Sequence, residues 1–139
     1  ENGQGVLQDY QQAVYWWKKS AEQGYAYAQF NLGAMYEKGQ GVLQDYKQAI
    51  YWYKKSAEQG YALAQYNLGV MYYNGKGVEQ DYAKAHMWLN ISAYSANPQA
   101  SKAIDILSKE MTSQQIAEAQ RMAREWVEKF EKRKKKKKE

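Results

Sequence analysis

The sequence predicts an all-α protein whose helices recur with a period of 36 residues. Residues 3–38 laid over 39–74 match at 28 of 36 positions, and residues 39–74 laid over 75–110 match at 11. Self-similarity at this spacing is typical of stacked repeats that bury their apolar faces against their neighbours. A hydrophobic content of 45% with a single proline also favours a folded chain. We therefore expect a solenoid, or α-α superhelix, of about seven helices.

The first expected helix covers residues 9–23 and is the second helix of a repeat whose first helix lies outside the sequence. Each copy begins this helix with a carboxylate that can accept free backbone N–H groups: Asp9, Asp45 and Asp81. Gly24 and Gly60 follow the helix end and favour a left-handed closing residue. Gly-x-Gly-Val segments precede the aspartates and predict turns at 3–6, 39–42 and 75–78.

The first helix of each repeat is expected over about 26–38 and 62–74. Gly33 and Gly69 lie inside it, although a glycine within a helix costs about 1 kcal/mol relative to alanine. Two glycines at one position of the repeat indicate the close approach of a neighbouring helix, under an aromatic ring. The helix ends at a glycine in both copies, Gly39 and Gly75.

The third unit departs from the repeat in its second half. Asn90 and Ile91 replace two lysines, and Asp105 replaces the glycine inside the helix. Pro98 suits the first turn of its helix. Because a terminal repeat must present a polar outer face, we interpret residues 97–131 as C-terminal capping helices.

Thr112 and Gln115 have the spacing of a capping box that opens the last helix. An apolar stripe follows on one side of that helix: Ile116, Ala119, Met122, Ala123, Trp126, Val127 and Phe130. We expect this helix to form a lid on the last repeat. Residues 132–139 are seven Lys or Arg and one Glu, and we expect a disordered basic tail because like charges repel.

These observations divide one solenoid domain into five segments. They are the second helix of a truncated repeat, two full repeats, the capping helices and the tail, at residues 1–24, 25–60, 61–96, 97–131 and 132–139.

Three motifs in this order carry a family resemblance. They are Ala-x-Ala-Gln-Tyr-Asn-Leu-Gly-x-Met-Tyr, Gly-x-Gly-Val-x-x-Asp-Tyr and Ala-x-x-Trp-Tyr-Lys-Lys-Ser-Ala-Glu-Gln-Gly-Tyr-Ala. The chain resembles the Sel-one-like repeat family, relatives of tetratricopeptide repeats, from residue 3 to about 96. The resemblance implies antiparallel helix pairs in a right-handed superhelix, with the first helix of each pair lining a concave face. It also implies roles in bacterial host interaction, envelope processes or eukaryotic quality control.

The formal charge of +5 is concentrated at one end of the chain. Residues 132–139 carry +6, which leaves −1 for residues 1–131. A nearly neutral body makes nucleic acid an unexpected partner outside the tail. An alternative function is electrostatic binding of nucleic acid or an anionic membrane through the lysine tail. A run that is merely solvated is the other interpretation.

Residues suited to catalysis or metal binding are scarce. The chain has one histidine and no cysteine, so we expect no zinc site, no cofactor and no enzyme activity. His86 takes an apolar position of the second helix, and we interpret it as structural. The Gly-x-Gly segments are interpreted as turns and not as phosphate loops. Some cysteine-rich relatives imply a β-lactam-hydrolase-like activity, which is the least favoured function because their disulfide-paired units are missing.

Eight positions differ between the two near-identical copies, and five of them lie in the first helix, in steps of 3, 4, 3 and 1. These steps place them on one helix face, which in the tetratricopeptide layout lines the concave groove. Rings and aliphatic side chains beside amides and isolated charges are typical of a groove that binds a peptide or protein. The predicted partner-binding residues are Tyr27, Phe30, Asn31, Glu37, Lys38, Leu63, Tyr66, Asn67, Val70, Tyr73, Asn74 and Lys102, and Gln99, Ile106 and Lys109 continue this face.

Neutral variation of exposed positions is the alternative explanation for these differences. It is less favoured because such variation should introduce Lys, Glu and Gln more often than Tyr, Phe, Leu and Val. The sequence therefore predicts a non-enzymatic scaffold for protein–protein interaction.

The truncated first repeat should leave one flank of its helix uncovered, so we expect end-to-end self-association through it. No apolar run approaches the roughly 20 residues of a membrane-spanning helix, and no signal-peptide pattern opens the chain. We expect a soluble protein, and export to the periplasm or secretion would require a signal peptide in a longer chain.

Overall fold

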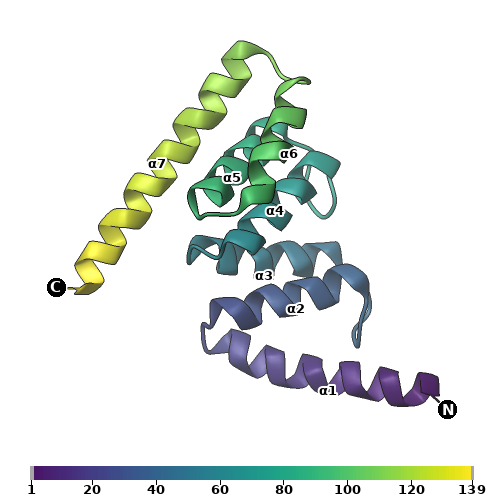
Figure 1. Ribbon diagram of the computed structural model, residues 1–139. Coiled ribbons are helices and arrows are strands. Elements are labelled where there is room, and N and C mark those ends of the chain that lie inside the picture. Colours follow the sequence, from purple (N-terminus) through teal and green to yellow (C-terminus); the bar gives the residue numbers. More distant parts are fainter. Residues whose placement is uncertain (1, 139) are drawn as a thin grey trace.

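The computed structural model describes residues 2–138 and contains seven α-helices and no strand within them. The helices are α1 (Asn2–Glu22), α2 (Ala26–Lys38), α3 (Tyr46–Glu58), α4 (Ala62–Asn74), α5 (Tyr82–Tyr94), α6 (Pro98–Ser108) and α7 (Ser113–Lys138). Helices α1 to α6 follow one another in a stack, and the long α7 runs back along one side of it (Figure 1). The all-α solenoid predicted from the sequence is confirmed.

The helices of a repeat pack closely as pairs, α2 with α3 and α4 with α5. Gly33 of α2 lies against Tyr53 of α3, and a Cβ added to the glycine would meet Tyr53 Cδ1 at 2.8 Å. At Gly69 of α4, an added Cβ would meet both the Ala85 carbonyl oxygen and Leu89 Cγ at 3.1 Å. Both glycines therefore permit close helix packing, as predicted, with an aromatic neighbour at Gly33 and an aliphatic one at Gly69.

The second helices of the two complete pairs begin at the predicted aspartate caps. The Asp45 carboxylate accepts hydrogen bonds from the backbone N–H groups of Lys47 and Gln48, at 3.0 and 3.1 Å. Asp81 accepts one from the N–H of Lys84 at 3.0 Å. These bonds satisfy donors that have no partner within the helix.

The predicted turns at 39–42 and 75–78 are present and lie against the preceding second helix. Gly41 and Gly77 both have a left-handed φ of 74°. A Cβ added to them would meet the carbonyl oxygens of Tyr10 and Tyr46, at 2.5 and 2.6 Å. Backbone conformation and available space therefore both require glycine at these positions.

The start of α1 differs from the prediction. We predict a turn at 3–6 and a cap at Asp9, but α1 is helical from Asn2 and Asp9 lies inside it. In the next repeat the loop is held by the preceding helix, because the Asp45 N–H donates to the Tyr36 carbonyl at 2.9 Å. The counterpart of that carbonyl for Asp9 would precede residue 1, so residues 2–8 follow their local helical preference. The capping role predicted for Asp9 is therefore wrong.

Helix α7 begins at the predicted capping box. The Thr112 N–H donates to Gln115 Oε1 at 2.9 Å, and the Gln115 N–H donates to Thr112 Oγ1 at 3.1 Å. The predicted apolar stripe of α7 faces α5, where the rings of Trp126 and Trp88 meet edge to face with centroids 5.7 Å apart. The capping box and the lid on the last repeat are thereby present as expected.

The seat for α7 on α5 comes from a change in the repeat. Lys19 of α1 and Lys55 of α3 are exposed, whereas Ile91, at the same position of α5, is fully buried. Ile91 belongs to an apolar cluster that includes Ala123 of α7. Replacing a solvated lysine with isoleucine therefore creates an apolar surface that α7 covers.

The outer face of α6 explains why α7 packs chiefly on α5. At the positions where α2 has Phe30 and Gly33, α6 has Lys102 and Asp105, and both are exposed. A charged face with no glycine does not allow the close packing seen between α2 and α3. Helix α6 thus presents the polar outer face expected of a terminal repeat.

The basic end of α7 is helical over residues 132–138, so the predicted disorder is wrong there; Glu139 lies outside the described residues. Lysine is a good helix former, and cations at a helix C-terminus interact favourably with the helix dipole. The ring of Phe130 also lies against Gly60, with Arg133 Cζ and Lys134 Nζ at 5.9 and 5.3 Å from the ring centre. Helix propensity and these contacts outweigh the repulsion between like charges.

Candidate functional site

The predicted groove residues lie on α2, α4 and α6, and specific contacts link these helices. The rings of Tyr27 and Phe30 on α2 lie against Tyr61, which caps α4, with centroids 6.2 and 5.3 Å apart. The Tyr73 hydroxyl at the end of α4 donates a hydrogen bond to Glu110, just beyond α6, at 2.9 Å. Predicted residues of one repeat are thereby connected to the next repeat.

The twelve predicted residues divide by exposure, and none is fully buried. Five are exposed: Tyr27, Lys38, Leu63, Asn74 and Lys102. Seven are half-buried: Phe30, Asn31, Glu37, Tyr66, Asn67, Val70 and Tyr73. Tyr27 keeps 56% and Leu63 keeps 44% of its surface accessible. The exposed members are available to a partner without rearrangement of the helices.

Two of the half-buried residues hold Tyr53 of α3 in place. The Phe30 ring lies 5.7 Å from the Tyr53 ring, and the Glu37 carboxylate accepts a hydrogen bond from the Tyr53 hydroxyl at 2.7 Å. Burial raises the pKa of Tyr53 above its usual range, and the Glu37 carboxylate raises it further because it would repel a phenolate. Phe30 and Glu37 therefore contribute to the packing of the repeat as well as to the predicted face.

Tyr73 is similarly fixed. Its ring stacks on Tyr82 of α5, with centroids 5.4 Å apart and an interplanar angle of 19°. The hydrogen bond to Glu110 raises the pKa of Tyr73, since the neutral hydroxyl is the donor. Tyr73 is thus a junction between repeats, and its ring is less available than periodicity alone suggests.

The best-formed part of the predicted face is a hollow of about 520 Å³ between α4 and α6. It is lined by Tyr66, Pro98, Gln99, Lys102, Ala103 and Ile106. Ile106 is 59% exposed, so the hollow offers an apolar wall opposite the Tyr66 ring, with polar groups at Gln99 and Lys102. A side chain of a bound peptide would find apolar contact and hydrogen-bonding groups together here.

The two predicted asparagines have different surroundings. Asn67 lies beside the Tyr53 hydroxyl, where it opposes the rise in the pKa of that tyrosine. Trp17 takes the place of Tyr53 in the preceding repeat and offers no oxygen. Asn31 Nδ2 is buried and has no hydrogen-bond partner among residues 2–138. Asn67 is therefore part of the packing, whereas Asn31 has an unused donor.

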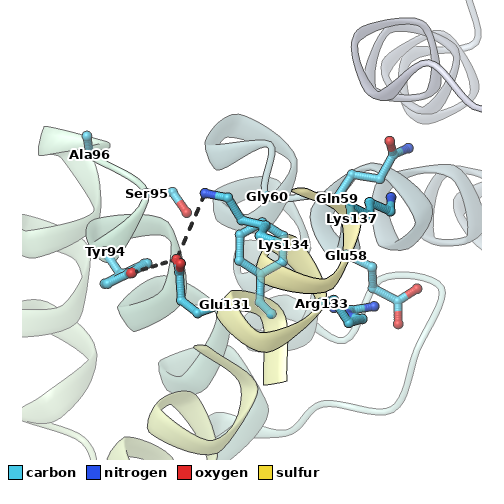
Figure 2. Close-up of a pocket in the computed structure, with 11 residues that line it drawn as sticks. Glu58, Gln59, Gly60, Tyr94, Ser95, Ala96, Glu131, Arg133, Lys134 and Lys137 are labelled. Atoms are coloured by element: carbon cyan, nitrogen blue, oxygen red, sulfur yellow. Dashed lines mark hydrogen bonds and ion pairs between the residues drawn. The ribbon is translucent and has the colours of Figure 1, made fainter. Parts of the chain in front are cut away.

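A second hollow was missed by the sequence reasoning. It has a volume of about 670 Å³ and lies between the end of α3, the α5–α6 turn and α7. Figure 2 shows Tyr94 bonded to Glu131 on one side, at 2.8 Å, with the Lys134 side chain beside them. The sequence signal was the replacement of Gln59 and Gly60 by Ser95 and Ala96 one period later.

The single histidine is held inside the repeat. His86 is fully buried, with Asn90 Nδ2 at 2.7 Å from its Nδ1 and Ser108 Oγ at 2.9 Å from its Nε2. Because the Asn90 amide is a donor, Nδ1 accepts and Nε2 donates to Ser108. Burial lowers the pKa of His86 and favours this neutral form. This arrangement agrees with a structural histidine that connects α5 to α6.

Two further searches concern residues 2–138. Within them, no group of three or more His, Cys, Asp or Glu side chains is placed to hold a metal ion. Nor does any helix in that range combine the length and apolar character needed to cross a membrane.

Stacked helix pairs of 36-residue period define a helical repeat protein of the tetratricopeptide-like class. The chain belongs to the Sel1 repeat family, whose repeat matches residues 1–25, 26–61 and 62–97. The resemblance noted from the motifs is thereby confirmed. The Sel1 repeat is typically a non-catalytic fold that mediates contacts between proteins.

Solved structures of two bacterial proteins are similar to the chain. One is c5321, a protective antigen present in uropathogenic Escherichia coli strains and displaying an SLR fold; it is 39% identical, with a TM-score of 0.83 over 86% of this chain and 26% of that chain. The other is a Sel1 repeat protein from Oxalobacter formigenes, 38% identical, with a TM-score of 0.67 over 69% of this chain and 40% of that chain. The chain thus spans less than half the length of either protein. No curated protein matches it.

Proposed function

We propose that the chain is a non-enzymatic scaffold that binds a peptide segment or partner protein along the face formed by α2, α4 and α6. The observation that carries this proposal is the exposure of Tyr27, Leu63 and Ile106, which keep 56%, 44% and 59% of their surface accessible. They belong to three successive first helices and flank the hollow at Tyr66. Membership of the Sel1 repeat family supports the proposal.

The side chains of this face indicate the chemistry of the partner. Rings and aliphatic groups supply apolar anchor points, which usually carry most of the binding free energy of an interface. Lys38 and Lys102 are exposed cations on the same face, and they would favour a carboxylate beside the anchor. The expected ligand is a peptide with a large apolar side chain next to Asp or Glu.

A second candidate function rests on the end of α7. Residues 132–138 are seven exposed cations on one helix. Such a segment can bind nucleic acid or an anionic membrane by neutralising phosphates, and the affinity would fall steeply with salt. Because residues 1–131 carry a formal charge of −1, this contact would be confined to the helix end.

A β-lactam-hydrolase-like reaction has less support. Such an activity needs a nucleophile and a base that converge in a pocket. His86 is buried and already bonded to Asn90 and Ser108, so we assign it no catalytic role.

The main proposal is tested by selecting a displayed library of random peptides on the full chain. Selected peptides should bind a triple variant, Tyr27→Ser, Leu63→Ser and Ile106→Ser, at least about 30-fold more weakly, as expected for the loss of roughly 2 kcal/mol at anchor positions. Because all three side chains are exposed, the Tm should change by no more than about 2 °C.

The control is a second triple variant on the other helices, Tyr10→Ser, Tyr15→Ser and Tyr51→Ser. These residues are 37%, 52% and 51% exposed, so the variant removes similar apolar surface and should leave peptide affinity unchanged. Equal affinity for the groove variant and the wild type would contradict the proposal. Loss of binding on removing residues 132–138, together with strong salt dependence, would favour the second candidate.

A further inference from the structure

One polar contact recurs between neighbouring repeats, and its second copy lacks a donor. In the first copy, Gln59 Nε2 donates hydrogen bonds to the Gly24 carbonyl and to Gln29 Oε1, both at 2.8 Å. Gln29 Nε2 in turn donates to the Ala21 carbonyl at 3.2 Å. The side-chain amide of Gln59 thus bridges the turn after α1 and a buried glutamine of α2.

One period later the same glutamine is present without its donor. Gln65 Nε2 donates to the Ala57 carbonyl at 3.0 Å, as Gln29 does to its counterpart. Position 95 is serine where the earlier copy has Gln59, and a serine side chain is too short to bridge both acceptors. Gln65 is fully buried, and its Oε1 has no hydrogen-bond partner in the part of the chain that the structure describes.

The place of the missing amide is open. The hollow of about 670 Å³ beside α7 is lined by Gly60 and Ser95, the counterparts of Gly24 and Gln59 (Figure 2). The backbone at Ser95 has φ −80° and ψ 16°, close to φ −89° and ψ 0° at Gln59. Since the two turns have nearly the same conformation, the second copy lacks the side chain while the turn itself is retained.

We propose that this hollow binds a primary amide, supplied either by an Asn or Gln side chain of a partner protein or by a free small molecule. The NH₂ group of the ligand donates to the Gly60 carbonyl and to Gln65 Oε1, as Gln59 does in the preceding repeat. The ligand's carbonyl oxygen accepts from the Ser95 hydroxyl or the Lys134 ammonium. This site is separate from the face formed by α2, α4 and α6 and does not depend on it.

The groups around the hollow favour a neutral donor over an ion. Arg133, Lys134 and Lys137 line it, and they repel an ammonium or guanidinium group. A carboxylate has no hydrogen to give to two carbonyl oxygens. A water molecule is the remaining occupant, and it would leave the hollow accessible without selecting among solutes.

The test is an NMR titration of the ¹⁵N-labelled full chain with N-acetylglutamine methylamide. Saturable shifts are expected for Gly60, Ser95 and the Gln65 side-chain amide, with a dissociation constant on the order of millimolar for so small a ligand. The glutamate analogue should produce none of them. Free glutamine forms a second arm: equal binding indicates that a free amide suffices, and binding of the peptide-like probe alone indicates a side chain of a partner.

Ser95→Gln should fill the hollow with an amide of the chain itself. We expect this variant to bind the probe at least about tenfold more weakly and to gain about 3 °C or more in Tm, because the two hydrogen bonds of the earlier copy are restored. Ser95→Ala leaves the hollow open and should still bind.

Two results would overturn the proposal: no saturable shift in the wild type, or probe affinity in Ser95→Gln equal to that of the wild type. The triple groove variant should bind the amide as the wild type does, so failure of this site is distinguishable from failure of the groove.

Discussion

His86 occupies a position that is apolar in the preceding repeat, Ile50, and it is nevertheless fully buried. A buried ring with two polar atoms is stable only when both have partners. Asn90 and Ser108 supply them, at 2.7 and 2.9 Å. The histidine and its two partners therefore form one polar unit that distinguishes the last repeat from the others.

This unit predicts a pH dependence of stability. Burial lowers the pKa of His86 below its usual value of about 6.5. As the pH falls through about 6.5, the unfolded chain binds a proton that the folded chain resists, so the free energy of unfolding should decrease between pH 7.5 and 5.5, by at most about 1.4 kcal/mol per pH unit. Above pH 7.5 both states are neutral and this contribution is constant.

The measurement is urea unfolding at several pH values for the wild type and for His86→Ile, which restores the residue of the preceding repeat. The variant is expected to be less stable, because Asn90 and Ser108 lose their partner, but to show a flatter pH profile in this window. The same slope in both proteins would rule out the histidine as the source, since the chain has no other histidine.

Glu37 and Tyr73 show what periodicity could not predict at the residue scale. Their positions on the helix were sufficient to assign both to the groove face, because helix geometry fixes the direction of a side chain. Their availability depends on partners elsewhere in the chain: Tyr53, 16 residues from Glu37, and Glu110, 37 residues from Tyr73. Long-range hydrogen bonds of this kind have no signature in the local sequence.

At the element scale, the central helices were predictable because caps, glycines and apolar spacing agree. The structure places α4 at Ala62–Asn74, as expected from its repeat. The ends were not predictable in the same way. Turn signals at 3–6 act only when a preceding helix holds the loop, and the charge of residues 132–138 does not prevent helix formation when α7 is already anchored at Phe130.

Docking of α7 should depend on Ile91. Ile91→Lys restores the residue type of Lys55 but places a charge beneath α7, at a position with no exposed surface. We expect the free energy of unfolding to fall by about 3 kcal/mol or more. Hydrogen exchange of residues 113–138 should rise strongly, while α2, α3 and α4 stay protected.

The matched control is Lys55→Ile, which makes the reverse change at the equivalent and exposed position of α3. It should leave the exchange of α7 unaltered. If α7 remained as protected in Ile91→Lys as in the wild type, its seat would have to lie elsewhere on α5.

At the scale of the whole molecule, the two ends of the stack have different surfaces. The outer face of α6 is charged, with Lys102 and Asp105 exposed. At the other end, α1 lies outermost (Figure 1) and exposes Trp16 to 64%. The same residue of the repeat is almost buried further along, with Trp52 at 8%, because the preceding helix pair covers it. The α1 end therefore presents an aromatic surface that the fold elsewhere keeps from solvent.

We expect this surface to make the chain self-associate through α1. Burying a tryptophan is strongly favourable, and exposed aromatic side chains with adjacent Tyr15, itself 52% exposed, form a contiguous apolar patch. Sedimentation equilibrium should show concentration-dependent association of the wild type, weakened at least about tenfold by Trp16→Gln. Tyr51→Gln removes a ring of similar exposure from α3 and should have no such effect. A wild type that stays monomeric at high concentration would show that Lys19, which lies over the Tyr15 and Trp16 rings at 4.6 and 5.7 Å, already shields the patch sufficiently.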